Sequence, residues 1–96
     1  MIPASMRAVI ADPPGGPEAL TLVDRPVPTP GAGQILVKVA AAGVNRPDVL
    51  QRQGNYQPPP GASDVLGLEA AGEVVGLGEG VRLHALGDFV TALLFR

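Results

Sequence analysis

The sequence contains no cysteine and no tryptophan, and its single histidine is His84. Without cysteine the chain cannot form disulfide bonds, so disulfides give no information about its redox compartment. Zinc sites in proteins usually draw on several histidine and cysteine ligands. The sequence therefore excludes a zinc site of that kind within this chain. His84 stands between Leu83 and Ala85 with no acid or nucleophile beside it, which is typical of a loop or edge residue.

The chain also has no excess of positive charge and no long apolar run. The 7 basic residues are scattered and outnumbered by 9 acidic ones, whereas a nucleic-acid surface needs clustered lysine and arginine. No apolar run approaches the ~20 residues that cross a bilayer. The N-terminus has no basic segment followed by an apolar one, as a secretory signal would. We therefore expect no nucleic-acid partner, no membrane partner and a cytoplasmic location.

What the chain does contain is apolar runs punctuated by glycine and proline. Hydrophobic residues make up 46% of the sequence, which opposes global disorder. We expect residues 1–96 to form one domain. Short runs rich in β-branched residues predict strands. In the run Val65–Leu77 the glycines make a bent strand more favourable than a helix. The expected strands are Met6–Ala11, Leu20–Val23, Ile35–Ala40, Phe89–Phe95 and Val65–Leu77. The Pro-rich segments Arg25–Gly31 and Asn55–Ser63 are expected to be an extended connection and a loop.

One segment, Asn45–Gln53, has the pattern of a helix. Asn45 suits the N-cap, Pro47 the first turn and Asp48 the position three residues after the cap. Gly54 would end the helix. Short strands, many turns and one or two short helices predict a mainly β fold, a small and partly open β-barrel.

The glycines also invite comparison with a nucleotide-binding loop. Gly76 and Gly78 match the first two positions of the dinucleotide fingerprint, but Val81 occupies the third. The segment 67–72 has the spacing of a phosphate loop, but Glu73 stands where lysine is required. We interpret these glycines as positions where the backbone bends, and Glu73 as a solvated strand residue.

Three segments in series carry a family resemblance. They are AAAGVNRPD at 40–48, QRQGNYQPPPGAS at 51–63, and LGLEAAGEVVGLGEGV at 66–81, closed by GDFV at 87–90. In this order they resemble the N-terminal GroES-like catalytic domain of the medium-chain dehydrogenase/reductase superfamily. The segment at 51–63 in particular is similar to that of the quinone oxidoreductases of the p53-inducible type. The resemblance runs from about Met6 to Leu94.

The resemblance implies zinc-independent chemistry. Zinc alcohol dehydrogenases of this superfamily carry a cysteine at the position of Asn45 and a histidine at that of Leu68. An amide is a poor zinc ligand and leucine is none. The chain therefore resembles the branch in which NADPH gives a hydride to a quinone or enone. The sequence leaves the oligomeric state open, with a homodimer as one possible assembly.

The resemblance also implies roles for particular residues. Asn45 would hydrogen-bond the nicotinamide-ribose end of the cofactor, and Tyr56 would line the cleft and offer its hydroxyl, so both are expected at the catalytic site. Asp48 would help to hold the cofactor by fixing the helix and polarising the site. Simpler alternatives remain: Asn45 as a helix cap only, and Tyr56 as a loop anchor packed on the prolines. Glu69 is expected to pair with Arg46 or Arg52.

In these relatives the cofactor's pyrophosphate is bound by a separate Rossmann domain, whose fingerprint is absent from these 96 residues. We expect this chain alone neither to bind NADPH tightly nor to reduce quinones. Two other classes stay open. One is a ring-forming co-chaperonin, against which the capped helix and Pro-rich loop of Asn45–Ser63 stand. The other is a vestigial domain that binds a partner.

Overall fold

The computed structural model describes residues 2–55 and 63–94, which form five strands, one α-helix and one 3-10 turn. Tyr56 lies outside the described residues. The elements, in chain order, are β1 (Ser5–Ala11), η1 (Pro17–Ala19), β2 (Leu20–Pro26), β3 (Ile35–Ala42), α1 (Arg46–Gln53), β4 (Glu69–Leu77) and β5 (Phe89–Leu93).

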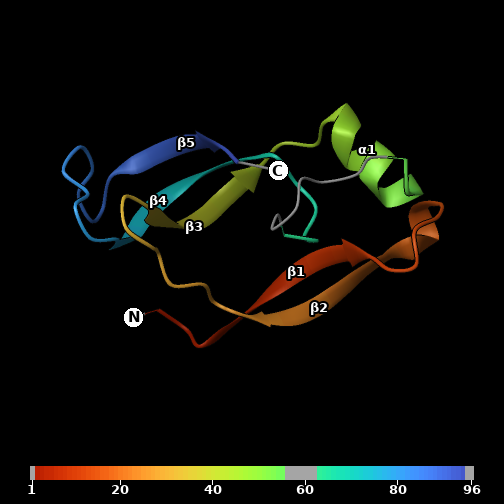
Figure 1. Ribbon diagram of the computed structural model, residues 1–96, viewed down its shortest axis with the longest axis horizontal. Helices are drawn as coiled ribbons and strands as arrows, with labels where there is room; N and C mark the ends of the chain where they lie inside the picture. Colours follow the sequence, from red (N-terminus) through yellow and green to blue (C-terminus); the bar gives the residue numbers. More distant parts are fainter. Residues whose placement is uncertain (1, 56–62, 95–96) are drawn as a thin grey trace.

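The strands form two antiparallel sheets. β1 and β2 make a hairpin with Ala8 opposite Val23, and β3, β4 and β5 make a three-stranded sheet in that order. In Figure 1 the hairpin lies along one side of the three-stranded sheet, and α1 stands at one end of the molecule, near the end of the hairpin where β1 ends and β2 begins. This arrangement confirms the expected small, mainly β fold class with one short helix.

The helix agrees with its predicted ends, and each strand differs from its predicted bounds at one end, by one residue in β1, two in β3 and β5, three in β2 and four in β4. α1 starts after Asn45 and ends at Gly54, whose φ of 84° is the left-handed conformation that glycine favours. β2 extends to Pro26, two residues into the segment expected to be a connection. Pro26 is tolerated there because it is the last residue of an edge strand, where no donated hydrogen bond is needed. β4 begins at Glu69 and not at Val65.

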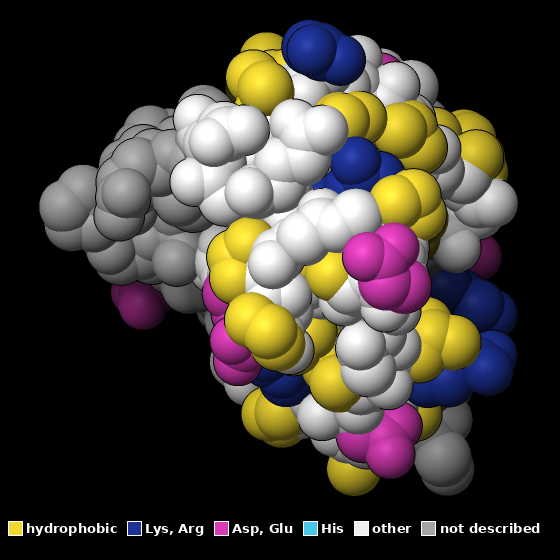
Figure 2. All heavy atoms as spheres, turned by 90° about the vertical axis from the view of Figure 1, so that its right-hand side faces the viewer, with side chains coloured by type: hydrophobic (Ala, Val, Ile, Leu, Met, Phe, Trp, Pro, Cys, Tyr) yellow, Lys and Arg dark blue, Asp and Glu magenta, His cyan; other side chains and the backbone are white. Residues whose placement is uncertain are grey.

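The hydrophobic core of the described part is small. Val74 is fully buried and Ala8 is 7% exposed, whereas the side chains of Val44 and Leu93 are each 84% exposed. Figure 2 views the end that carries α1, where apolar side chains lie interspersed with basic and acidic ones. A domain of this size buries only a modest core. No helix among the described residues is long and apolar enough to cross a membrane.

Two glycines in or beside β4 are required by close backbone contacts. A Cβ at Gly72 would overlap the carbonyl oxygen of Lys38 in β3, and one at Gly78 would overlap the carbonyl oxygen of Gly31. Gly72 lies next to an irregularity in the β3–β4 register. The sequence predicted that Gly67, Gly72 and Gly78 permit bends, and that the glycines of this strand suit close backbone contacts. Gly67, with φ of 117°, fits the first reason, and Gly72 fits the second. Gly78 allows the segment after β4 to approach the backbone of Gly31.

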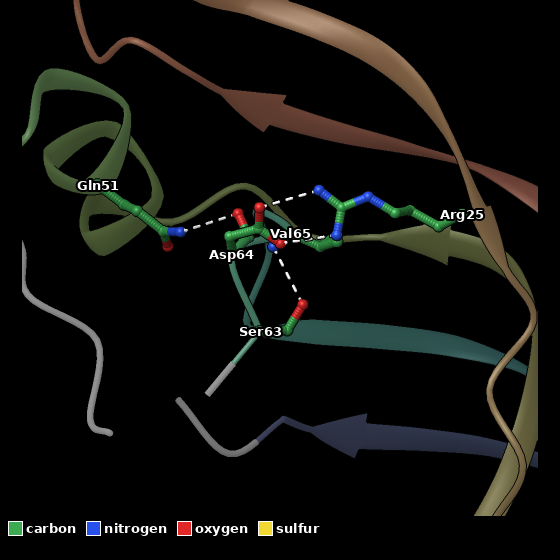
Figure 3. Close-up of polar contacts among 5 residues, drawn as sticks. All are labelled: Arg25, Gln51, Ser63, Asp64 and Val65. Carbon is green, nitrogen blue, oxygen red and sulfur yellow. Dashed lines mark hydrogen bonds and ion pairs between the residues drawn. The ribbon is translucent and has the colours of Figure 1, made fainter. Parts of the chain in front are cut away.

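A polar clamp joins the hairpin to the region around α1. The guanidinium of Arg25 donates two hydrogen bonds of 2.9 Å to the carboxylate of Asp64, and the side-chain amide of Gln51 donates to the Asp64 carbonyl oxygen at 3.3 Å. Figure 3 shows Asp64 between Arg25 of β2 and Gln51 of α1. The hydrogen bonds that Arg25 donates to Asp64, and then the negative charge of Asp64, raise the pKa of Arg25 above its already high ordinary value. Arg25 therefore stays charged throughout the neutral range.

Replacing Arg25 by glutamine is expected to lower the melting temperature by a few degrees at most. The pair is partly exposed, with 35% of the Arg25 side chain and 62% of the Asp64 side chain accessible, so solvent screens it. Scanning calorimetry at low and at 1 M salt would measure the effect. We expect the difference from wild type to shrink at high salt. A difference that is unchanged by salt would contradict an electrostatic clamp.

Candidate functional site

The candidate site forms where β3 ends, α1 begins and β4 begins. Asn45 is the N-cap of α1, Asp48 lies in its first turn, and Glu69 is the first residue of β4. The chain turns into a helix here because Asn45 adopts an extended backbone, with φ of −125° and ψ of 163°, followed by a proline in the first turn. The predicted residues Asn45 and Asp48 are thus neighbours. Tyr56 cannot be placed beside them, because it lies outside the described residues.

Asp48 is the buried polar residue of the site, with 8% of its surface exposed. Its Oδ2 accepts a hydrogen bond of 2.9 Å from the backbone N–H of Asn45, and its Oδ1 accepts one of 3.1 Å from the backbone N–H of Gly67. The carboxylate therefore ties the start of α1 to the segment that leads into β4. This agrees with the expectation that Asp48 fixes the helix. Its contact with a cofactor stays a prediction.

The side chain of Asn45 is held by Glu69. The Nδ2 of Asn45 donates a hydrogen bond of 3.0 Å to Oε1 of Glu69. The expected pairing of Glu69 with Arg46 or Arg52 was wrong: within residues 2–55 and 63–94 no ion pair joins them. The reason is that Glu69 opens β4 opposite the end of β3, which brings it to the loop that carries Asn45.

Gly43 makes room for this carboxylate. The backbone N–H of Gly43 donates to the Glu69 carbonyl oxygen at 3.2 Å, so the two backbones run side by side. A Cβ on Gly43 would overlap the Glu69 carboxylate. Glu69 can therefore fold back toward Asn45 only because residue 43 has no side chain. Sequence reasoning missed the roles of Gly43 and Glu69, since Glu69 is 24 residues from its partner Asn45.

Two cavities flank this loop. One of about 440 Å³ is lined mainly by small residues of β3, β4 and β5, with Glu69 at its border and Thr91 and Leu93 on the outer strand. The other, of about 330 Å³, lies against α1 and is lined by apolar residues together with Asp48 and Arg52. Gly43 borders both. The first is an open depression, bordered by the glutamate that holds Asn45.

Among the described residues, no cluster of three histidine, aspartate or glutamate side chains has the arrangement of a metal site. Position 45 presents an amide that is already bonded to a carboxylate, and position 68 presents a leucine. Neither side chain has the donor chemistry that zinc prefers.

Comparisons with known proteins agree on the family to which this chain is similar. The alcohol dehydrogenase GroES-like domain family matches residues 31–94. Over 89 residues the chain is 38% identical to the human synaptic vesicle membrane protein VAT-1 homolog-like, covering 93% of this chain and 21% of that protein. It is 43% identical to glucose 1-dehydrogenase of Thermoproteus tenax, covering 95% of this chain and 26% of the enzyme. It is 42% identical to quinone oxidoreductase of Lama guanicoe, covering 88% and 26%.

Solved structures agree. The chain matches the quinone oxidoreductase from Coxiella burnetii with a TM-score of 0.81 and 33% identity, over 93% of this chain and 29% of that one. It matches a mycobacterial protein complexed with NADPH with a TM-score of 0.79 and 35% identity, over 93% and 28%. The chain thus spans about a quarter of the length of these relatives. It belongs to the alcohol dehydrogenase GroES-like domain family of the medium-chain dehydrogenases and reductases.

Proposed function

We propose that this domain forms the substrate side of an NADPH-dependent quinone or enone oxidoreductase that works without zinc. The observation that carries the proposal is the pair Asn45–Glu69 beside a cavity of about 440 Å³. An amide at position 45 and a leucine at position 68 suit hydrogen bonding and packing better than metal binding. Relatives named quinone oxidoreductases, and one solved with NADPH, support this choice within a family that also includes a glucose dehydrogenase.

In this proposal the protein supplies position and polarity. The hydride itself comes from the nicotinamide. Asn45 would hydrogen-bond the nicotinamide-ribose end, and the Tyr56 hydroxyl would donate to the oxygen of the quinone, where negative charge develops. Asp48 would act through Asn45, because its two oxygens accept hydrogen bonds from the backbone N–H groups of Asn45 and Gly67. The p53-inducible branch, the homodimer and the cytoplasmic location are further parts of the proposal.

A chimera would test this function. Residues 2–94 would replace the matching segment of the Coxiella burnetii quinone oxidoreductase, to which they align at a TM-score of 0.81. We expect the purified chimera to oxidise NADPH with 1,4-benzoquinone as acceptor. Asn45→Ala in the chimera should slow the reaction, while the exposed variant Glu79→Ala should not. A folded chimera that binds NADPH but reduces neither quinones nor enones would contradict the proposal.

The chain by itself is expected to bind NADPH only in the millimolar range or more weakly, because it carries no dinucleotide fingerprint for the pyrophosphate. Isothermal titration calorimetry of NADPH into the 96-residue chain measures this directly. A dissociation constant in the micromolar range, ~1 to 10 μM with a favourable free energy near ~7 kcal/mol, would show that the chain holds a phosphate site of its own.

A further inference from the structure

The contact between Asn45 and Glu69 has a direction that the chemistry of the two side chains fixes. An ionised carboxylate can only accept hydrogen bonds, so the group of Asn45 that faces it must be the NH2 and not the carbonyl oxygen. The structure agrees, with Nδ2 at 3.0 Å from Oε1. The orientation of this amide, which is often ambiguous in proteins, is therefore set here by a charged partner.

We infer that Glu69 is a positioning residue for the reaction: it locks the amide of Asn45 in one orientation, and Gly43 keeps the carboxylate where it can do so. The inference rests on the function proposed above for Asn45. Charge-assisted hydrogen bonds are shorter and stronger than neutral ones, so the lock favours one rotamer of Asn45 over the alternative flip. The NH2 group of Asn45 has a second N–H, which this lock holds in a fixed position for a ligand.

The backbone around the pair is fixed independently, so the side chains have a rigid base. Asp48 holds the backbone N–H of Asn45 at 2.9 Å, and Gly43 donates its N–H to the Glu69 carbonyl oxygen at 3.2 Å. The Asn45 side chain faces the backbone N–H of Asp48 in a capping box, and Glu69 holds its NH2 group at 3.0 Å. Preorganised donors and acceptors lower the reorganisation needed during reaction. Loss of the restraint should therefore affect catalysis more than folding.

Glu73 is the matched control for Glu69. It lies four residues further along the same strand, is exposed, and faces Lys38 of β3 and Phe89 of β5 in the register. With a spacing of four along a strand the two glutamates share a face. Removing Glu73 therefore removes the same charge from the same face without touching Asn45.

The first arm of the test is nuclear magnetic resonance on the ¹⁵N-labelled 96-residue chain. The Asn45 side-chain amide would be identified by its disappearance in Asn45→Ser. We expect one of its two Hδ2 resonances to lie downfield of the corresponding resonance of the exposed Asn55. This shift should be lost in Glu69→Ala, kept in Glu69→Gln, whose oxygen can still accept, and kept in Glu73→Ala.

Gly43→Ala gives the sharper version, because it leaves both partners in place. Its Cβ would displace the Glu69 carboxylate. We expect this variant to lose the downfield shift as Glu69→Ala does, while backbone resonances far from the site keep their dispersion. A shift that survives in Glu69→Ala would overturn the inference.

The second arm measures kinetics in the chimera. Glu69→Ala should lower kcat/KM about 10-fold, and Glu69→Gln should recover it to within about 3-fold of wild type. Equal losses of kcat/KM in Glu69→Ala and Glu73→Ala would show that the effect comes from the loss of negative charge in general. That result would overturn the positioning role of Glu69. A chimera without any quinone activity would instead contradict the proposed function, and the resonance arm alone would then decide whether Glu69 orients Asn45.

Discussion

Gly72→Ala is expected to lower the free energy of unfolding by about 3 kcal/mol, because overpacking of this kind costs about 1–3 kcal/mol and here the obstacle is backbone. A Cβ at this position would overlap the carbonyl oxygen of Lys38 and crowd a methyl group of Val37. A carbonyl in a paired strand cannot rotate away as the end of a side chain can. The two strands would have to separate at the centre of the β3–β4 pairing, beside the buried Val74.

Urea unfolding followed by far-ultraviolet circular dichroism would measure this loss from the shift of the midpoint at constant slope. Gly15→Ala is the matched control. A Cβ there would meet Ala19 at 3.6 Å, an ordinary contact, so we expect a change within about 0.5 kcal/mol of wild type. A small domain has only about 5–15 kcal/mol of stability, so the loss at Gly72 should be conspicuous. Equal midpoints for the two variants would contradict the close strand approach.

Asp48→Ala should destabilise the domain by a similar amount, about 3 kcal/mol, since an unsatisfied buried donor costs about 1–3 kcal/mol. The substitution leaves the backbone N–H groups of Asn45 and Gly67 without the oxygens that accept from them at 2.9 and 3.1 Å. It also releases the start of α1 from the segment before β4. Urea unfolding measures the loss, and hydrogen exchange at the N–H of Asn45 should speed up.

Asp24→Ala is the control for the loss of an aspartate. Asp24 lies exposed in β2, and a surface substitution of this kind usually changes stability by less than about 0.5 kcal/mol. If Asp48→Ala lowered the free energy of unfolding as little as Asp24→Ala, the Asp48 carboxylate would not stabilise the contact between the start of α1 and the segment before β4.

The sequence predicted the structural features that depend on residues close together in the chain. The ends of α1 could be predicted because Asn45, Pro47, Asp48 and Gly54 act on residues at most four positions away. The strands followed from runs of apolar, β-branched residues. The same helix, observed in the structure, stands against the co-chaperonin alternative, which would have a mobile loop in its place.

Features that depend on pairing between distant segments could not be predicted. The sequence offered Arg46 and Arg52 as partners for Glu69. Only the register of β3 with β4 brings Glu69 to Asn45. The sequence indicated that Gly72 suits a close backbone contact, but not that its neighbour is the carbonyl oxygen of Lys38. β2 runs to Pro26 because the hairpin pairs that residue with Ser5, which nothing near Pro26 in the sequence reveals.

In the proposed site an amide held by Glu69, and not a metal ligand, occupies position 45. Metal dependence of the chimera tests it most directly. After dialysis against EDTA, we expect quinone-dependent oxidation of NADPH to continue at the same rate, and added zinc to leave the rate unchanged. Activity that disappears on chelation and returns with zinc would instead show that the reaction depends on a metal.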